Sequence, residues 1–252
     1  MYEAHEEMQA MRDVTPLLPK AHISTRSDMT VELIKHSASD EDVVRAAKVS
    51  TKAGEFNPED VSYGFINYLM KNRHGSPFEH AYFTFYVEAP IFVWREHMRH
   101  RIASYNEESG RYKVLEPVFY VPSISRNLQQ IGKTGHYEFI PGDNEQVLAV
   151  WDSLELNSMN SYMEYQDLLH KGIAKEVARM VLPVNIYSSA YVTMNARALM
   201  NFLSLRTHDD LSHFPSYPQR EIEMVAEQYE AIFKEIMPLT YASFVENGRV
   251  AP

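Results

Sequence analysis

Apolar and polar residues follow two different periods along this chain. Patterns rich in aromatic and β-branched residues predict strands at residues 29–37, 81–89, 118–122 and 186–194. Helical spacing predicts helices at residues 39–50, 57–75, 91–101, 144–170, 174–182, 195–206 and 219–237. Capping and stop residues support these bounds, with Ser39 and Asn57 at helix starts and Gly75 at a helix end.

The order of these elements predicts the fold class. Strands and helices do not alternate regularly, and the chain is not all helical, so we expect an α+β fold with an antiparallel-type sheet and long helices. Residues 1–28 show little periodicity and contain Pro16 and Pro19, so we expect an irregular N-terminal extension. Residues 29–252 contain no repeat or linker and are expected to form a single domain.

Composition and charge exclude several classes of function. The 252-residue chain has no cysteine, which excludes disulfides, thiolate catalysis and zinc sites built on sulfur. Its formal net charge of −10 argues against general nucleic-acid binding. No apolar run reaches the roughly 20 residues that span a bilayer, and the N-terminal stretch lacks the apolar part of a secretory signal. We therefore expect a cytoplasmic protein that binds neither nucleic acid nor membrane.

The stretch RHRIASYNEESGRY, residues 99–112, gathers arginines in this acidic chain. Such a cluster fits a small anionic ligand, and phosphate matches the guanidinium group bidentately. If residues 91–101 are helical, Arg95 and Arg99 share a face. The polar loop that is expected to follow can aim backbone N–H groups at an anion, with Gly110 permitting close approach. A solvated helix end, where the helix dipole favours cations, explains the same residues.

Two further stretches carry polar residues beside apolar ones. In RHGSPFEH, Ser76 and Glu79 are placed either to hydrogen-bond a ligand or to close an ordinary turn. In NARALMNFLSLR, Arg197 and Asn201 lie four apart on one helical face, and the plainest role of Asn195 is an N-cap. Structural roles account for each residue singly, but less well for two Asn and two Arg on one short, otherwise apolar helix.

Metal and serine chemistry are both disfavoured. The chain has 11 histidines, but none lies in H-E-x-x-H or another known ligand spacing, and the arginines beside His97 and His100 would repel a cation. We therefore expect no metal. Ser109 lacks the G-x-S-x-G elbow, and its arginine neighbours suit a hydrogen-bonding serine better than a nucleophile.

Several segments together resemble one known family. RHRIASYNEESGRY is similar to the signature of the flavin-dependent thymidylate synthases, or thymidylate synthase complementing proteins: Arg-His-Arg, then Ser several residues later, then Gly-Arg-Tyr. VRAAKVS, NRHGSPFEHAYFTFYVEAPIFVWREHMRHR, EVARMVLP and NARALMNFLSLR resemble further family segments, in family order. The resemblance extends from about residue 30 to residue 237.

This resemblance implies a fold, a reaction and an assembly. The fold is the α+β fold expected above, and the assembly is a homotetramer whose active sites are shared between subunits. The reaction is reductive methylation of deoxyuridine monophosphate (dUMP) to thymidylate (dTMP). The one-carbon donor is 5,10-methylenetetrahydrofolate, and FAD reduced by NADPH is the hydride source. Such a reaction needs no thiolate on the uracil ring, in agreement with the absence of cysteine.

The resemblance also assigns residues to a site. Arg206 is the implied catalytic residue, because a cation beside the uracil stabilises the negative charge that forms as N3 loses its proton. The implied FAD contacts are Ser76, Arg99, His100, Arg101, Glu107, Asn195, Arg197 and Asn201, with Ser50 and Glu79 as weaker assignments. The implied dUMP contacts are Glu96, His97, Met98, Arg99, Glu107, Glu108, Ser109, Gly110, Arg111, Arg179 and Arg206.

Three features depart from the family pattern. Glu96 stands where some members have glutamine, the loop at residues 207–218 is longer than usual, and the first 28 residues match nothing in the family. Two other classes of protein stay open. One is a related nucleotide-binding module that binds dUMP without turnover, and the other is an RNA-binding protein, which the acidic charge disfavours.

Overall fold

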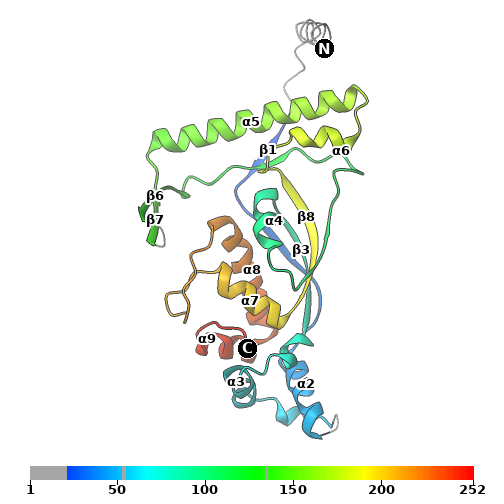
Figure 1. Ribbon diagram of the computed structural model, residues 1–252, viewed down its shortest axis with the longest axis vertical. Helices are drawn as coiled ribbons and strands as arrows, with labels where there is room; N and C mark the ends of the chain where they lie inside the picture. The colour runs from blue at the N-terminus through cyan, green and yellow to red at the C-terminus, as the bar shows by residue number, and fades with distance from the viewer. Residues whose placement is uncertain (1–21, 53–54, 134–135) are drawn as a thin grey trace, which may run out of the picture. The chain divides into compact units, whose positions relative to one another are not determined.

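The computed structural model describes residues 22–52, 55–133 and 136–252 (Figure 1). They form two compact units: a larger one of Ser27–Glu108 with Tyr187–Pro252, and a smaller one of Ser109–Ile186 with the segment that ends at Arg26. The expected α+β class is confirmed, because helices accompany antiparallel sheets.

The expected domain bounds are not tested by this division and stay predictions. Most of the predicted irregular extension, residues 1–28, lies outside the described residues. Within its last part the chain is regular, because Ser24–Arg26 forms the strand β1.

The larger unit is built on a four-stranded antiparallel sheet with the order β2–β3–β8–β4. Its strands are β2 Thr30–Ser37, β3 Tyr82–Pro90, β8 Tyr187–Asn195 and β4 Ser104–Glu107. β3 and β8 pair over their whole length, from Tyr82 opposite Asn195 to Pro90 opposite Tyr187, with no shift in register. Alternate residues of β3 are buried, as the alternation in the sequence predicts.

Three helices cover one face of this sheet: α4 Ile91–His97, α7 Ala196–Arg206 and α8 Arg220–Ile236 (Figure 1). Between the sheet and α8, the rings of Phe85 and Tyr229 lie 4.4 Å apart, centroid to centroid. Phe83 meets Phe233 of the same helix edge to face at 6.2 Å. Such ring geometries add to the free energy of apolar burial, so this aromatic layer forms the core between the sheet and α8.

The helices α2 Asp40–Lys52, α3 Tyr63–Lys71 and α9 Pro238–Glu246 pack against one another. The buried Asp40 carboxylate accepts hydrogen bonds from the backbone N–H groups of Leu239 and Thr240, each at 2.9 Å, and from the Thr240 hydroxyl at 2.6 Å. N–H groups at a helix start have no partner within the helix. Asp40 therefore caps α9 from another helix.

The predicted single helix over residues 57–75 is wrong, because two helices form there. Asn57 caps a short 3-10 helix, η1 Pro58–Asp60, as the sequence predicts for the start. Val61 and Ser62 are then extended, and the Ser62 side chain accepts a hydrogen bond from the backbone of α3. Ser62 is thus a second capping residue within the predicted helix. It begins a separate helix instead of continuing the first one.

The smaller unit holds a long helix, α5 Asn144–His170, which the sequence predicts at the same residues. The Phe119 ring of β5 Val118–Tyr120 meets Tyr162 of this helix edge to face at 6.2 Å. The remaining elements are the hairpin of β6 Asn127–Lys133 and β7 His136–Pro141, α6 Lys175–Ala178 and the 3-10 helix η3 Arg179–Val181. β5 also pairs in parallel with β1.

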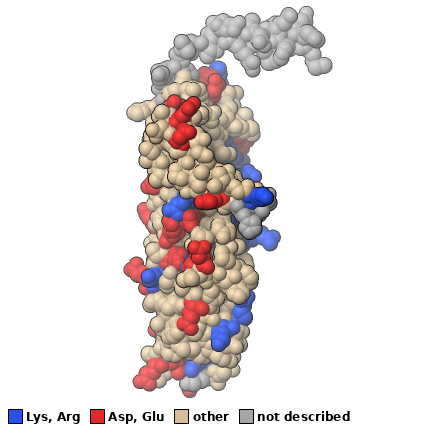
Figure 2. Space-filling view, turned by 90° about the vertical axis from the view of Figure 1, so that its left-hand side faces the viewer, with Lys and Arg blue, Asp and Glu red and all other residues tan. Residues whose placement is uncertain are grey.

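Acidic side chains are scattered over the face seen in Figure 2 rather than gathered in one patch. This spread agrees with the formal net charge of −10. Arginines that gather on such an acidic protein therefore need a local cause.

In the part of the chain that the structure describes, no helix combines the length and apolar character needed to cross a membrane.

We expect Asp40→Ala to lower the free energy of unfolding by about 2 kcal/mol, because it leaves one buried and one part-buried N–H group of α9 without an acceptor. Urea unfolding followed by circular dichroism measures the change. Glu41→Ala is the matched control on the same helix. Glu41 forms an exposed ion pair with Arg45, whose loss costs under about 0.5 kcal/mol. Equal effects of the two substitutions would contradict the capping role.

Candidate active site

The candidate site lies where the C-terminal ends of α4 and α7 meet. α4 follows β3 and α7 follows β8 without a connecting loop, and the two strands are antiparallel. The helices therefore run toward each other over the same face of the sheet. At their meeting point the rings of His100 and Phe202 lie 4.5 Å apart.

The predicted helix over residues 91–101 is too long, because α4 ends at His97. The chain continues as a tighter turn, in which the N–H of His100 donates to the carbonyl of His97 at 3.1 Å. The Tyr105 hydroxyl lies 3.1 Å from the carbonyl oxygen of His97 and 2.9 Å from that of His100. A partner from β4 therefore satisfies carbonyls that another helical turn would have used.

Arg206, the last residue of α7, is held by two side chains from α4 and the turn after it. Its Nε donates to Nε2 of His100 at 3.0 Å, and its Nη1 donates to Oε2 of Glu96 at 3.0 Å. A guanidinium group has donors but no acceptor, so Nε2 of His100 accepts and the ring is neutral. The two acceptors orient the guanidinium through two different N–H groups.

The pKa values in this group follow from burial and from the neighbouring cations. Burial, followed by the charges of Arg206 and Arg99, lowers the pKa of His100 to about 4. Burial also lowers the pKa of Arg206, and Arg99 acts in the same direction while Glu96 opposes it. His100 is therefore neutral at physiological pH, as its hydrogen bond to Arg206 requires.

His97 lies in the core and does not line the cavity described below. Its Nε2 is 2.9 Å from the Tyr229 hydroxyl and its Nδ1 is 3.2 Å from the Tyr105 hydroxyl. Burial, followed by the charge of His100, lowers the pKa of His97 to about 3. Met98, by contrast, is exposed. His97 and Met98 are both predicted dUMP contacts. The structure places the His97 side chain in the interior, away from the surface.

A cavity of about 530 Å³ opens beside Arg206. The predicted site residues that line it are Arg99, His100, Arg101, Asn201 and Arg206. Arg99 and Arg101 are exposed, and neither guanidinium group has a hydrogen-bond or ion-pair partner among the residues that the structure describes. Two unpaired cations beside a cavity favour an anionic ligand. In the same described residues, no three His, Asp or Glu side chains are grouped to hold a metal ion.

Sequence reasoning missed the rest of the cavity wall, which consists of Ile102, Ala103, Met194, Ala198, Leu205 and Ser216. Ala198 lies three positions before Asn201 on α7, and Leu205 lies four positions after it. Helical spacing from Asn201 would have found both. Ser216 belongs to the loop after α7, and no local sequence signal marks it.

Arg197 lies at the N-terminal end of α7 and does not line this cavity. Its Nη1 donates to Oε1 of Glu79 at 2.5 Å, and its Nε donates to the backbone oxygen of Pro252 at 2.6 Å. A Cβ atom on Gly75 would lie 2.6 Å from Cζ of Arg197, so glycine is required for the guanidinium to sit there. The structure therefore brings Arg197 and Glu79 together, as one polar group separate from the cavity lining.

Three other predicted FAD contacts also lie outside the cavity lining. Asn195 caps α7 by accepting a hydrogen bond from the N–H of Ala198 at 2.8 Å, which confirms the plainest reading of this residue. Ser76 is exposed on the short 3-10 helix η2 Ser76–Glu79. Ser50 is exposed on α2. Their contacts with FAD stay predictions.

Glu107 is the last residue of the strand β4, and Glu108 follows it directly, so the predicted loop after Arg101 is wrong in its first half. β4 pairs with β8, and Glu107 lies opposite Ala190. The Ser188 hydroxyl donates to Oε1 of Glu107 at 2.6 Å, and the N–H of Ser189 donates to Oε1 of Glu108 at 3.1 Å. Cross-strand pairing with a long neighbour makes this polar segment a strand.

Ser109, Gly110, Arg111 and Arg179 belong to the smaller unit. The N–H of Arg111 donates to the Ser109 hydroxyl at 3.3 Å, and Nε of Arg111 donates to Glu176 at 2.9 Å. A Cβ atom on the buried Gly110 would lie 3.2 Å from Cδ of Arg179. The glycine thus lets Arg179 lie close to this turn, and the structure brings these predicted nucleotide contacts together.

Comparison with known proteins assigns the family. The family model of the thymidylate synthase complementing protein matches residues 32–239. A flavin-dependent thymidylate synthase of Streptomyces avermitilis is 57% identical over 236 residues, which cover 91% of this chain and 96% of that protein. One of Tropheryma whipplei is 56% identical over 230 residues, covering 90% and 96%.

The chain belongs to the thymidylate synthase complementing protein family.

The predicted family is therefore confirmed, and a solved structure agrees with it. A UMP/dUMP methylase, PolB from Streptomyces cacaoi, bound with 5-Br UMP, superposes with a TM-score of 0.85. It is 52% identical, and the match covers 92% of this chain and all of that one. The same methylase bound with 5-Br dUMP gives a TM-score of 0.86 at 51% identity.

We expect acidification to destabilise this member of the family through His97. Its pKa is about 3 in the folded protein and about 6.5 in the unfolded chain, so unfolding takes up a proton between these values. Stability falls as the pH drops below 6.5, by about 2 kcal/mol at pH 5.

Urea unfolding at pH 7 and pH 5 of the wild type and of His97→Gln measures this contribution. Glutamine keeps hydrogen-bonding groups near Tyr105 and Tyr229 but does not titrate, so the variant is expected to lose less stability on acidification. An identical pH dependence in both proteins would show that His97 does not carry it.

Proposed function

We propose that this chain is a flavin-dependent thymidylate synthase that methylates dUMP to dTMP. The observation that carries the proposal is Arg206, held by Glu96 and His100 at the edge of a cavity that Arg99 and Arg101 also line. Family membership supports the proposal. So do relatives named flavin-dependent thymidylate synthase, which match this chain over nearly their whole length.

The residues of the cavity fit a flavin dinucleotide. Its pyrophosphate is anionic, and Arg99 and Arg101 are cations that have no carboxylate partner among the described residues. Asn201 offers an amide donor and acceptor, while Ile102 and Leu205 supply an apolar wall for a flat ring. We infer that these residues hold FAD, together with Arg197 and Glu79 at the other end of α7.

When bound, FAD reduced by NADPH would supply the hydride for methylation of the uracil, with 5,10-methylenetetrahydrofolate as the one-carbon donor. The chain's own residues bind and orient. Arg206 stabilises the negative charge on the uracil as N3 loses its proton, which makes C5 more nucleophilic. Glu96 and His100 hold the guanidinium in place beforehand, so that no reorganisation is needed when this charge forms. No cysteine is required at C6.

The nucleotide phosphate is proposed to bind the turn of Ser109, Gly110 and Arg111, with Arg179 beside it. Backbone N–H groups and guanidinium groups are suitable donors for a phosphate dianion. In the proposed homotetramer, active sites are shared between subunits, so residues of one chain need not all serve the same site. Met98, Glu107 and Glu108 are proposed dUMP contacts on the same grounds of resemblance.

UMP is a second candidate substrate. The solved relative at 52% identity is titled a UMP/dUMP methylase and was crystallised with both 5-bromo nucleotides. The two substrates differ in the ribose 2′-hydroxyl.

We expect the purified protein to release tritium from [5-³H]dUMP when FAD, NADPH and 5,10-methylenetetrahydrofolate are present. Parallel assays with [5-³H]UMP decide between the two substrates through the ratio of kcat/KM. Binding of dUMP without tritium release in the complete mixture would instead favour the nucleotide-binding module without catalysis.

We expect Arg206→Ala to lower kcat by roughly 10²- to 10³-fold, the usual cost of removing one group that stabilises charge in the transition state. FAD affinity, measured by fluorescence quenching, is expected to change little. Arg45→Ala, an exposed arginine on α2, is the control and is expected to leave both quantities unchanged. Equal loss of FAD binding and turnover in Arg206→Ala would show that Arg206 is structural.

A further inference from the structure

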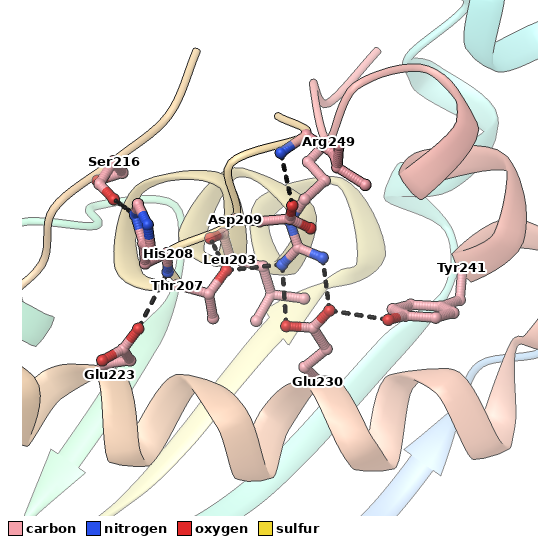
Figure 3. Close-up of polar contacts among 10 residues, drawn as sticks. Leu203, Thr207, His208, Asp209, Ser216, Glu223, Glu230, Tyr241 and Arg249 are labelled. Carbon is pink, nitrogen blue, oxygen red and sulfur yellow. Dashed lines mark hydrogen bonds and ion pairs between the residues drawn. The ribbon is translucent and has the colours of Figure 1, made fainter. Parts of the chain in front are cut away.

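Thr207 directly follows Arg206 and ends α7 (Figure 3). Its backbone N–H donates to the carbonyl of Leu203 at 3.0 Å, and its hydroxyl donates to the same oxygen at 2.7 Å. The last turn of a helix otherwise frays, because its carbonyls lack partners further along the helix. The buried Thr207 side chain therefore fixes the turn that carries Arg206.

The Thr207 hydroxyl is in turn fixed by a buried ion pair. Nη2 of Arg249 donates to Oγ1 of Thr207 at 2.6 Å. The same guanidinium donates to Glu230 of α8 through Nη1 at 2.6 Å and through Nη2 at 2.9 Å, and the Tyr241 hydroxyl donates to Glu230 at 2.9 Å. Arg249 is 5% exposed. Figure 3 shows this chain of contacts running from α8 through Arg249 to the end of α7.

The backbone of Arg249 is held in a conformation that its residue type disfavours. Its φ is 58°, in the left-handed region, and Gly248 before it has a φ of 71°. The Gly248 carbonyl accepts from the N–H of His213, in the loop at residues 207–218, at 2.9 Å. Asp209 of the same loop lies 3.8 Å from Nε of Arg249. The turn after α9 thus holds this loop and the end of α7 together.

The loop also reaches the cavity. Ser216 lines it, and the Ser216 hydroxyl donates to the carbonyl of Leu205 at 2.8 Å. Nδ1 of His208 lies 2.7 Å from the Ser216 carbonyl oxygen, and the N–H of His208 donates to Glu223 of α8 at 3.0 Å. The loop at residues 207–218 is therefore tied both to Leu205 of α7 and to Glu223 of α8.

We propose that Thr207, Arg249 and Glu230 form a positioning clamp, which sets the orientation of Arg206 against Glu96 and His100. This inference rests on the proposed function, since it assigns a role to residues behind the proposed catalytic arginine. Neither Thr207 nor Arg249 lines the cavity, and both act through the last turn of α7. The clamp is a second constraint on Arg206, independent of the two acceptors on the α4 side.

Thr207→Val tests the clamp, because valine has nearly the same shape but can neither accept from Arg249 nor donate to Leu203. Thr207→Ser keeps the hydroxyl and is the conservative variant. Thr240→Val is the matched control, since Thr240 is also a buried threonine whose hydroxyl forms a hydrogen bond with a charged group, Asp40, but it lies on α9. The holoenzyme of each is assayed with [5-³H]dUMP.

We expect Thr207→Val to lower kcat roughly tenfold or more, with FAD affinity within about twofold of wild type, because a small misplacement of a catalytic group is costly. Thr207→Ser is expected to restore most of the rate, and Thr240→Val to lose stability without losing kcat. Equal kcat in wild type and Thr207→Val would overturn the clamp, as would equal losses of kcat in Thr207→Val and Thr240→Val.

A readout that does not need turnover separates this inference from the proposed function. The charge of Arg206 helps to lower the pKa of His100, so NMR titration of the His100 ring reports where Arg206 lies. Thr207→Val is expected to raise the pKa of His100 toward its ordinary value, and Thr240→Val to leave it unchanged. An unchanged His100 titration in Thr207→Val overturns the clamp even in an inactive protein, whereas an inactive wild type with the expected titration overturns the proposed reaction alone.

Discussion

The unbroken pairing of β3 with β8 is the constraint on which the rest of the site depends. Each strand continues directly into a helix, so the strand register also sets where those helices begin. α4 has 7 residues and α7 has 11, which gives lengths of about 10 and 16 Å, against about 30 Å for nine paired strand residues. The two helices together span the strand pair, and their C-terminal ends meet at His100 and Arg206.

This meeting of helix ends explains why an acidic chain gathers arginines here. The C-terminal end of a helix carries partial negative charge, and two such ends converge beside Glu96. Arg206 is bound by Glu96 and by a neutral His100, while Arg99 and Arg101 remain available to a ligand. Protonation of His100 would remove an acceptor and add a cation beside Arg206, so the burial that lowers its pKa also maintains the site.

Local sequence signals predicted the helices that are set by interactions between residues near one another in the chain. Asn195 caps α7 and α5 lies at its predicted residues, because caps and apolar periodicity act within a few residues. β4 was missed because its polar sequence becomes a strand by pairing with β8, and α4 was overextended because Tyr105 satisfies its carbonyls from a distance. For the site, the family motifs named Arg99, His100, Arg101, Asn201 and Arg206, and the structure places all five at one cavity. Neither the burial of His97 nor the contact of Arg249 with Thr207 could be predicted, since both depend on packing between elements distant in sequence.

The absorption spectrum of the purified protein, recorded with and without dUMP after addition of FAD, is the decisive measurement for the proposal that the cavity at the ends of α4 and α7 holds flavin. We expect visible flavin bands that stay with the protein through gel filtration and that shift when dUMP is added. We also expect Arg101→Ala to weaken retention of the flavin. A protein that retains no flavin, or one whose flavin bands respond to neither dUMP nor UMP, would contradict it.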